Sequence, residues 1–156
     1  MRIYIPARIG DLAEPSVSPR VVHAVTHGLI QAIDVDEPEV LEAVAMNAAA
    51  DDSLRLLEED VRAAKSAIYR RCVIVAEVAD TLVAEAAGDV LPTALIVHHA
   101  VPWDRVESIH VDDRDAEQDV AEAAHGDEAA FERAADGELM WYDVLERNDL
   151  YTALAR

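Results

Sequence analysis

The residues best suited to chemistry are a histidine and an aspartate that lie two positions apart. Polar and apolar residues alternate from Ser108 to Asp112, which predicts a strand with His110 and Asp112 on the same face. An imidazole beside a carboxylate can carry out general acid–base catalysis, because histidine titrates near neutral pH. His110 and Asp112 are therefore the candidate catalytic residues.

The same pair could bind a divalent metal ion if a histidine from the preceding strand joined it. His98 and His99 lie in the strand predicted over residues 95–101, where successive side chains face opposite sides. One of them would share a face with His110 and Asp112 if the two strands pair. Imidazole and carboxylate groups are suitable ligands for zinc and similar ions. The alternative role for Asp112 and Asp113 is to cap the amides of the helix that follows.

The sequence lacks the motifs of several common enzyme classes. Its serines lack the G-x-S-x-G elbow, and its five glycines fit neither the G-x-G-x-x-G nor the G-x-x-x-x-G-K-[ST] pattern. Classical dinucleotide and Walker-type sites are excluded, and we expect no cofactor. Cys72, the only cysteine, lies in an apolar run, which predicts a buried and inert thiol. Whether the chain is an enzyme stays open.

Three aromatic residues are candidates for binding another molecule. Trp141 and Tyr142 are adjacent near the C-terminus, and Trp103 follows a proline that ends a predicted strand. Tryptophan and tyrosine are favoured anchors of protein interfaces when they are exposed. They also fill cores where a terminal helix docks, and Trp103 could either cover the sheet or line a cleft. Exposed apolar surface around these residues would support binding, and burial would remove its support.

The elements that must position these residues can be read from apolar periodicity. Five strands are predicted over residues 2–6, 21–25, 71–78, 95–101 and 108–112. Helices are predicted over residues 27–33, 36–62, 115–124, 127–135 and 138–154, the last of which could instead begin as an edge strand.

This order of elements predicts an α/β fold, with α+β as the alternative. We expect one layered domain over residues 1–156, with a mixed sheet of about five strands packed with helices. The short connection over residues 102–107 makes the two strands beside it expected neighbours. A parallel pair needs a longer crossover, so this pair should be antiparallel.

Composition limits the class of partner. The chain has 32 acidic and 13 basic residues, a formal net charge of −19, and these argue against nucleic acid or an anionic membrane as partner. The charge fits a solvated acidic surface, a basic partner or a metal cation. No apolar run approaches the roughly 20 residues that span a bilayer. We therefore expect a cytoplasmic protein.

Three short segments carry a resemblance to other proteins. RIYIPA at residues 2–7, VDD at residues 111–113 and LMWYDVLE at residues 139–146 resemble a set of short, acidic, alanine-rich actinobacterial proteins of unknown function. The resemblance spans most of the chain and implies an intracellular bacterial protein with an α/β fold. It supplies no catalytic or binding residues.

Two classes of function follow from these observations. The first is a noncatalytic cytoplasmic binding or protein-interaction domain, which uses Trp103, Trp141 or Tyr142 to hold an unknown protein or a second copy in a homodimer. The second is a small metal-dependent hydrolase centred on His110 and Asp112. The sequence favours the first, because histidine–carboxylate neighbours arise by chance in so acidic a chain.

Overall fold

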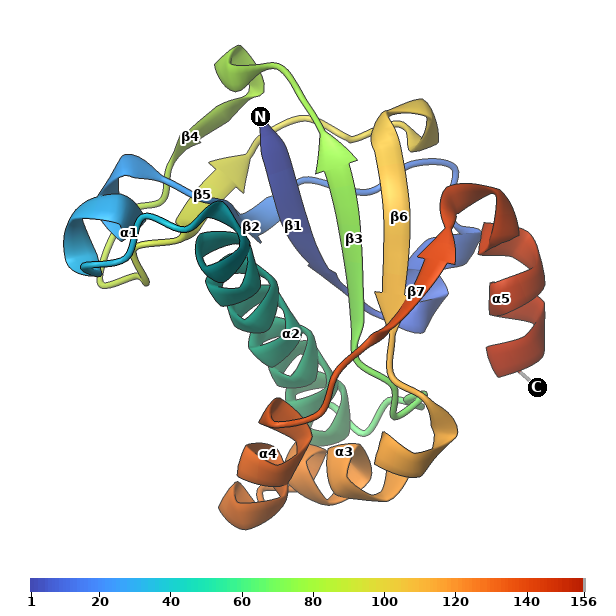
Figure 1. Cartoon of the computed structure of the whole chain (residues 1–156). Helices are drawn as coiled ribbons and strands as arrows, with labels where there is room; N and C mark the ends of the chain where they lie inside the picture. The colour runs from blue at the N-terminus through green and yellow to red at the C-terminus, as the bar shows by residue number, and fades with distance from the viewer. Residues whose placement is uncertain (156) are drawn as a thin grey trace.

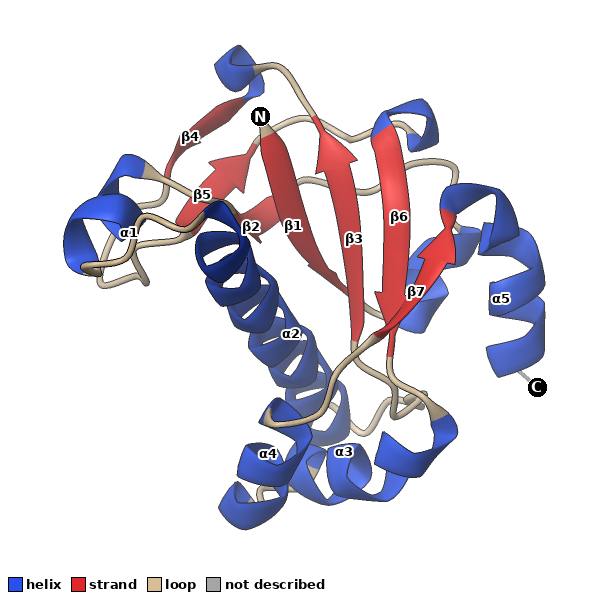
Figure 2. Ribbon diagram, in the orientation of Figure 1, coloured by secondary structure: helices blue, strands red, loops and turns tan. Residues whose placement is uncertain are grey.

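The computed structural model describes residues 1–155, and within them the chain forms one sheet of seven strands with five α-helices (Figure 1, Figure 2). The strands are β1 Arg2–Ala7, β2 Arg20–His23, β3 Cys72–Glu77, β4 Val83–Glu85, β5 Ala94–Val97, β6 Val106–Val111 and β7 Met140–Asp143. The helices are α1 His27–Ala32, α2 Pro38–Arg62, α3 Glu117–Ala124, α4 Glu128–Ala135 and α5 Arg147–Leu154. Short 3₁₀ turns are η1 Ile9–Ala13, η2 Asp80–Leu82, η3 Trp103–Arg105, η4 Arg114–Ala116 and η5 Val144–Glu146.

The layered α/β architecture expected from the sequence is confirmed, with differences in the sheet. Over residues 1–155 the strand order is β4-β5-β2-β1-β3-β6-β7 and every pairing is antiparallel, so the sheet is not mixed. It holds seven strands instead of about five because a short strand is added at each edge. β4 and β7 are three and four residues long, too short to show a clear alternation in the sequence.

For residues 138–154 the alternative of an edge strand is confirmed at the start of the segment, and the prediction of one helix over the whole segment is wrong there. Residues Met140–Asp143 form β7, which pairs with β6, and α5 begins only at Arg147. Two hydrogen bonds mark the change from strand to helical turn. The Asp143 carboxylate accepts from the Leu145 amide, and the Glu146 carboxylate accepts from the Asp143 amide. This reciprocal capping begins a new helical segment after the strand.

The expectation that β5 and β6 are neighbours is also wrong, because β2, β1 and β3 lie between them. β5 pairs with β2 and β4, and β6 pairs with β3 and β7. Crossing four strand spacings takes about 19 Å. The eight residues between Val97 and Val106 can extend about 26 Å, so the crossing is within reach. Near the middle of this connection, Val101 forms an isolated antiparallel β-bridge with Val17.

The two faces of the sheet are covered differently. One face carries an apolar core that includes Ile3, Ile5, Ile74 and Ile109, and Leu150 of the last helix, α5, packs into it. On the other face α2 packs over β1, β2 and β3 (Figure 1). Its buried surface is rich in alanine, at positions 45, 48, 49 and 50, so the helix can approach the sheet closely.

α2 stops short of β6 and β7, and this determines where the sheet is open. The helices α3 and α4 pack on the far end of α2 through a separate apolar cluster that includes Leu54, Leu57 and Val120. They leave the outer part of the α2 face, over β6 and β7, without a covering helix (Figure 1). Among residues 1–155 no helix is both long and apolar enough to cross a membrane.

Candidate functional site

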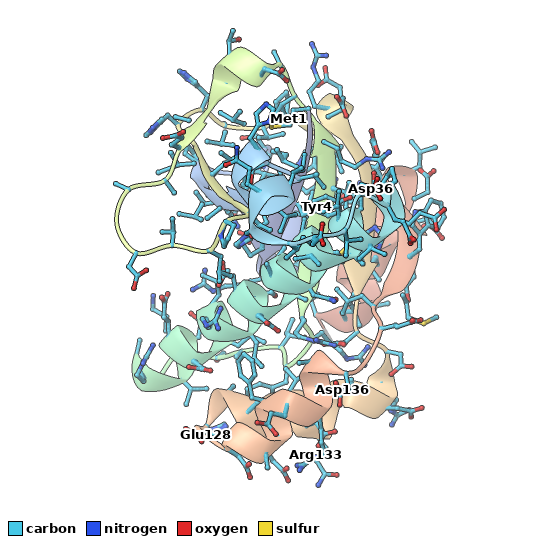
Figure 3. The ribbon with its side chains drawn as sticks, turned by 60° about the vertical axis from the view of Figure 1, so that its left-hand side comes forward. Met1, Tyr4, Asp36, Glu128, Arg133 and Asp136 are labelled. Atoms are coloured by element: carbon cyan, nitrogen blue, oxygen red, sulfur yellow. The ribbon has the colours of Figure 1, made fainter. Side chains whose placement is uncertain are left out.

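A groove lies on the open part of the sheet, between α2 and β7. It has a volume of about 380 Å³ and is lined by Arg2, Tyr4, Met46, Val75, Glu107, Ser108, His110 and Trp141. The strand register brings these side chains together. Tyr4 lies opposite Val75, Val75 lies opposite Ser108, and His110 lies opposite Trp141, so all of them share one face. Figure 3 shows Tyr4 beside the N-terminal turns of α2.

His110 lies in this groove and is paired with a hydroxyl group. Its Nε2 is 2.9 Å from the Ser108 Oγ, two residues earlier on the same face of β6. Burial lowers the pKa of His110, so the ring is neutral at pH 7 and one of its nitrogens can accept a hydrogen bond. A hydroxyl beside a neutral imidazole has the composition of a nucleophile–base pair, which in enzymes is oriented by a third group. Within residues 1–155 no carboxylate is hydrogen-bonded to His110 to orient it.

Asp112 shares the face predicted for it, but its carboxylate is used by another residue. It accepts three hydrogen bonds from Arg71: the backbone amide and Nε at 2.8 Å and Nη2 at 2.7 Å. Both side chains are almost fully buried. Asp113, not Asp112, caps the turn that follows, by accepting from the amides of Asp115 and Ala116. Asp112 therefore joins the end of β6 to the start of β3.

The structure does not bring together the histidines of the metal hypothesis. His98 and His99 are exposed at the end of β5, and three strands separate β5 from β6, which carries His110. Among the described residues there is no group of three or more histidine, cysteine, aspartate or glutamate side chains that could hold a metal ion. The alternative of a metal-dependent hydrolase centred on His110 and Asp112 has no support.

The three aromatic candidates differ in what surrounds them. The Trp103 indole donates to the Glu14 carbonyl at 2.8 Å, and the Arg147 guanidinium covers its ring at 4.3 Å from the centroid. Tyr142 is half-buried against the core on the opposite face from the groove. Trp141 is 61% exposed at the edge of the groove. Of the three, it is the side chain that is available to a partner.

Charged groups at one end of the groove are partly balanced. Arg2 reaches Glu42 with Nη1 at 3.4 Å and Glu107 with Nη2 at 3.2 Å. Burial raises the pKa of the Tyr4 hydroxyl, so it remains a neutral donor at physiological pH. Because His110 is neutral as well, Arg2 is the cation among the lining residues and faces two carboxylates.

Sequence reasoning missed a buried polar chain beside the middle of α2, on the side of β2. His23 Nδ1 is 2.7 Å from Thr93 Oγ1, and its Nε2 is 2.6 Å from Asp52 Oδ2, which makes a carboxylate–imidazole–hydroxyl chain. Its order matches a catalytic triad, but Thr93 is only 2% exposed and cannot reach a substrate. The polar positions at residues 51 and 52 were the sequence signal, since polar groups on an apolar helix face need partners.

A second cavity, of about 510 Å³, lies near this chain and is lined in part by Arg8, Arg20 and Arg55. Each arginine is already paired with a carboxylate. Arg8 contacts Asp60, Arg20 contacts Asp11 and Arg55 contacts Asp52, with distances of 2.6–2.9 Å. This cavity therefore has no excess positive charge, and its arginines serve to join β1, β2 and α2.

Comparison with known proteins identifies a family for this chain but no activity. Neither the curated proteins nor the solved structures include a significant match to this chain. A model of a family of unknown function, DUF6912, matches residues 1–151 and so spans nearly the whole chain. The chain belongs to this family of unknown function, DUF6912.

Proposed function

We propose that this protein is a noncatalytic cytoplasmic binding protein that captures a partner protein at the groove beside Trp141. The observation that carries the proposal is the exposure of Trp141, at 61%, on a face that the helices leave open. Large exposed aromatic side chains are costly to leave in water and are enriched at interface hot spots. The groove beside the indole gives a partner side chain a place to enter.

The neighbourhood of Trp141 supports a protein as the occupant. Met140 and Leu145, at 49% and 90%, are also exposed around the edge of β7, so apolar surface extends beyond one ring. A protein interface buries about 800 Å² on each partner, so a partner must cover the edge of β7 as well as the groove. With a formal net charge of −19, the favoured partner presents a basic surface.

Selection from a random peptide library displayed on phage tests the proposal directly. The folded full chain is the target, and Trp141→Ala is used for counter-selection because it removes the anchor without changing the charge. We expect peptides that bind the parent chain at least about tenfold more tightly than the variant, as for a hot-spot residue. Leu91→Ser is the matched control, since it removes exposed apolar surface next to β5, on the side of the sheet away from β7.

Two outcomes would overturn the proposal. Peptides that bind the parent chain and Trp141→Ala equally well would show that the groove is not the site. A monomer–dimer equilibrium in sedimentation velocity that Trp141→Ala abolishes would assign the same surface to a second copy, the homodimer that the sequence left open. The wild-type chain should instead sediment as a monomer, since two copies that each carry a charge of −19 repel each other.

A further inference from the structure

We infer that the segment captured at the groove is extended and carries an arginine, whose guanidinium lies on the Trp141 ring while its backbone pairs with β7. This inference rests on the binding role proposed above and specifies the chemistry of the partner. Three independent features of the described residues support it: the indole without a cation, the two carboxylates around Arg2 at the end of the groove, and the open edge of the sheet.

The first feature is a difference between Trp141 and both Trp103 and Phe131, whose rings each carry a guanidinium. Trp103 carries the Arg147 guanidinium at 4.3 Å, and Phe131 has the Arg55 guanidinium at 5.7 Å. Within residues 1–155 no arginine or lysine lies over Trp141. An indole is the aromatic ring that attracts a cation most strongly, so Trp141 offers a vacant site for a partner's cation.

The second feature is the charge around Arg2, at the end of the groove. Arg2 lies between Glu42 and Glu107, so one guanidinium faces two carboxylates. All three side chains are about two-fifths exposed, and a partner's guanidinium can share the carboxylates with Arg2. A planar guanidinium can stack on the indole and also donate to a carboxylate, which an ammonium does less well. An anionic ligand would be repelled.

The third feature is the outer edge of β7. Asp143 lies opposite Ser108, but its amide donates to the Glu146 carboxylate at 2.8 Å instead of to β6. In an antiparallel pair the residues alternate between hydrogen-bonded and non-hydrogen-bonded positions. Trp141, two residues from Asp143, therefore directs its amide and carbonyl outward as well. β7 is the last strand of the sheet over residues 1–155, so an added strand can pair there.

These features define one binding geometry. Trp141 supplies both the ring and the outward backbone groups, so a partner residue that pairs with its backbone lies beside its indole. In an antiparallel pair, side chains directly opposite each other are about 4.5–5.5 Å apart at Cβ. An arginine at that partner position can lie on the indole and extend over the groove towards Glu107.

Four synthetic peptides of one design test the inference. The first has the acetylated and amidated sequence Thr-Val-Thr-Arg-Thr-Val-Thr, which favours an extended chain. The second replaces arginine by citrulline, which keeps the shape and removes the charge. The third and fourth keep arginine and carry N-methyl groups on alternate amides, each in one of the two possible frames, so that one of them blocks strand pairing. Binding to the full chain is measured by isothermal titration calorimetry.

The arginine peptide should bind, and binding should weaken by about tenfold with citrulline, with one N-methyl frame and with Trp141→Ala. Glu107→Gln should weaken binding of the arginine peptide but not binding of the citrulline peptide. Glu128→Gln is the charge-matched control, because Figure 3 shows Glu128 on α4, at the end of the molecule away from Met1 and Tyr4. It should leave binding unchanged.

The outcomes separate this inference from the proposed function. Equal binding of the arginine and citrulline peptides that still depends on Trp141 would overturn the inference and leave the binding role intact. Equal effects of both N-methyl frames would overturn the strand pairing. If Trp141→Ala does not change the affinity for the arginine peptide, the binding reflects attraction to the acidic surface in general. That result would overturn both the inference and the proposed function.

Discussion

At the scale of single residues, the pair formed by Arg71 and Asp112 has the largest expected effect on stability. A buried ion pair is costly to break from one side, because the remaining charge has no partner and no water. Asp112→Ala should lower the free energy of unfolding by about 3–5 kcal/mol. Urea denaturation at pH 7, followed by circular dichroism, would measure the loss.

A double variant separates two causes of this destabilisation: the loss of the hydrogen bonds, and the burial of a charge that has no partner. Arg71→Met combined with Asp112→Leu removes both charges and keeps much of the apolar volume. It should recover most of the stability that Asp112→Ala loses. A double variant as unstable as the single one would show that the Arg71 hydrogen bonds, including the one to the Gly137 carbonyl, matter more than the charge.

At the scale of elements, Asp52 is one of the ionisable groups that join α2 to the sheet, through its contact with His23 of β2. Burial acts to raise the pKa of the Asp52 carboxyl, but hydrogen bonds from His23 and Arg55 act against it, and the net effect is a lowered pKa. A carboxyl whose pKa is lower in the folded state contributes stability above its unfolded pKa. That contribution disappears as the pH falls through the folded pKa.

Asp52→Asn should therefore destabilise the protein by about 1–2 kcal/mol at pH 7, as expected for partly exposed, charge-assisted hydrogen bonds. The difference from the parent chain should shrink as the pH falls below about 4. Urea denaturation of both chains from pH 3 to pH 7 would measure this difference in the free energy of unfolding. Asp51→Asn is the matched control, because burial raises the pKa of Asp51, so removing its charge should not destabilise the protein at pH 7.

The elements also show how far the sequence can predict this fold. α2 was predictable because its apolar residues recur at helical intervals and its end at Arg62 follows the last of them. For β7 the sequence left a strand and a helix open, because residues 138–154 keep helical spacing and the strand depends on pairing with β6, 29–35 residues earlier. The order of β5 and β6 depends in the same way on distant partners, which local patterns do not specify.

The candidate site was predictable to a similar degree. His110 and Trp141 were named from their types and spacing, and the structure places both in one groove because they face each other across β6 and β7. The partner of Asp112 was not foreseen, since Arg71 lies 41 residues away. The chain of His23, Asp52 and Thr93 joins residues up to 70 apart in sequence, so only the folded sheet reveals it.

At the scale of the whole molecule, the excess of 32 acidic over 13 basic residues predicts an effect of salt on stability. Like charges repel one another more in the compact state than in the unfolded chain, and salt reduces this repulsion. The Debye length falls from about 30 Å at 0.01 M to about 8 Å at 0.15 M ionic strength. Most ion pairs here are partly exposed, and such pairs contribute about 1 kcal/mol or less, so screening them costs little.

The melting temperature at pH 7 should therefore rise with sodium chloride over this range, by a few degrees for about 1 kcal/mol. Differential scanning calorimetry would measure it, and sucrose at matched osmolality would control for effects unrelated to charge. The Arg71–Asp112 pair is shielded from salt by burial, so the rise should persist in the double variant that lacks it. A melting temperature that falls with salt would mean that the surface ion pairs outweigh the repulsion, and that this acidic surface stabilises the fold.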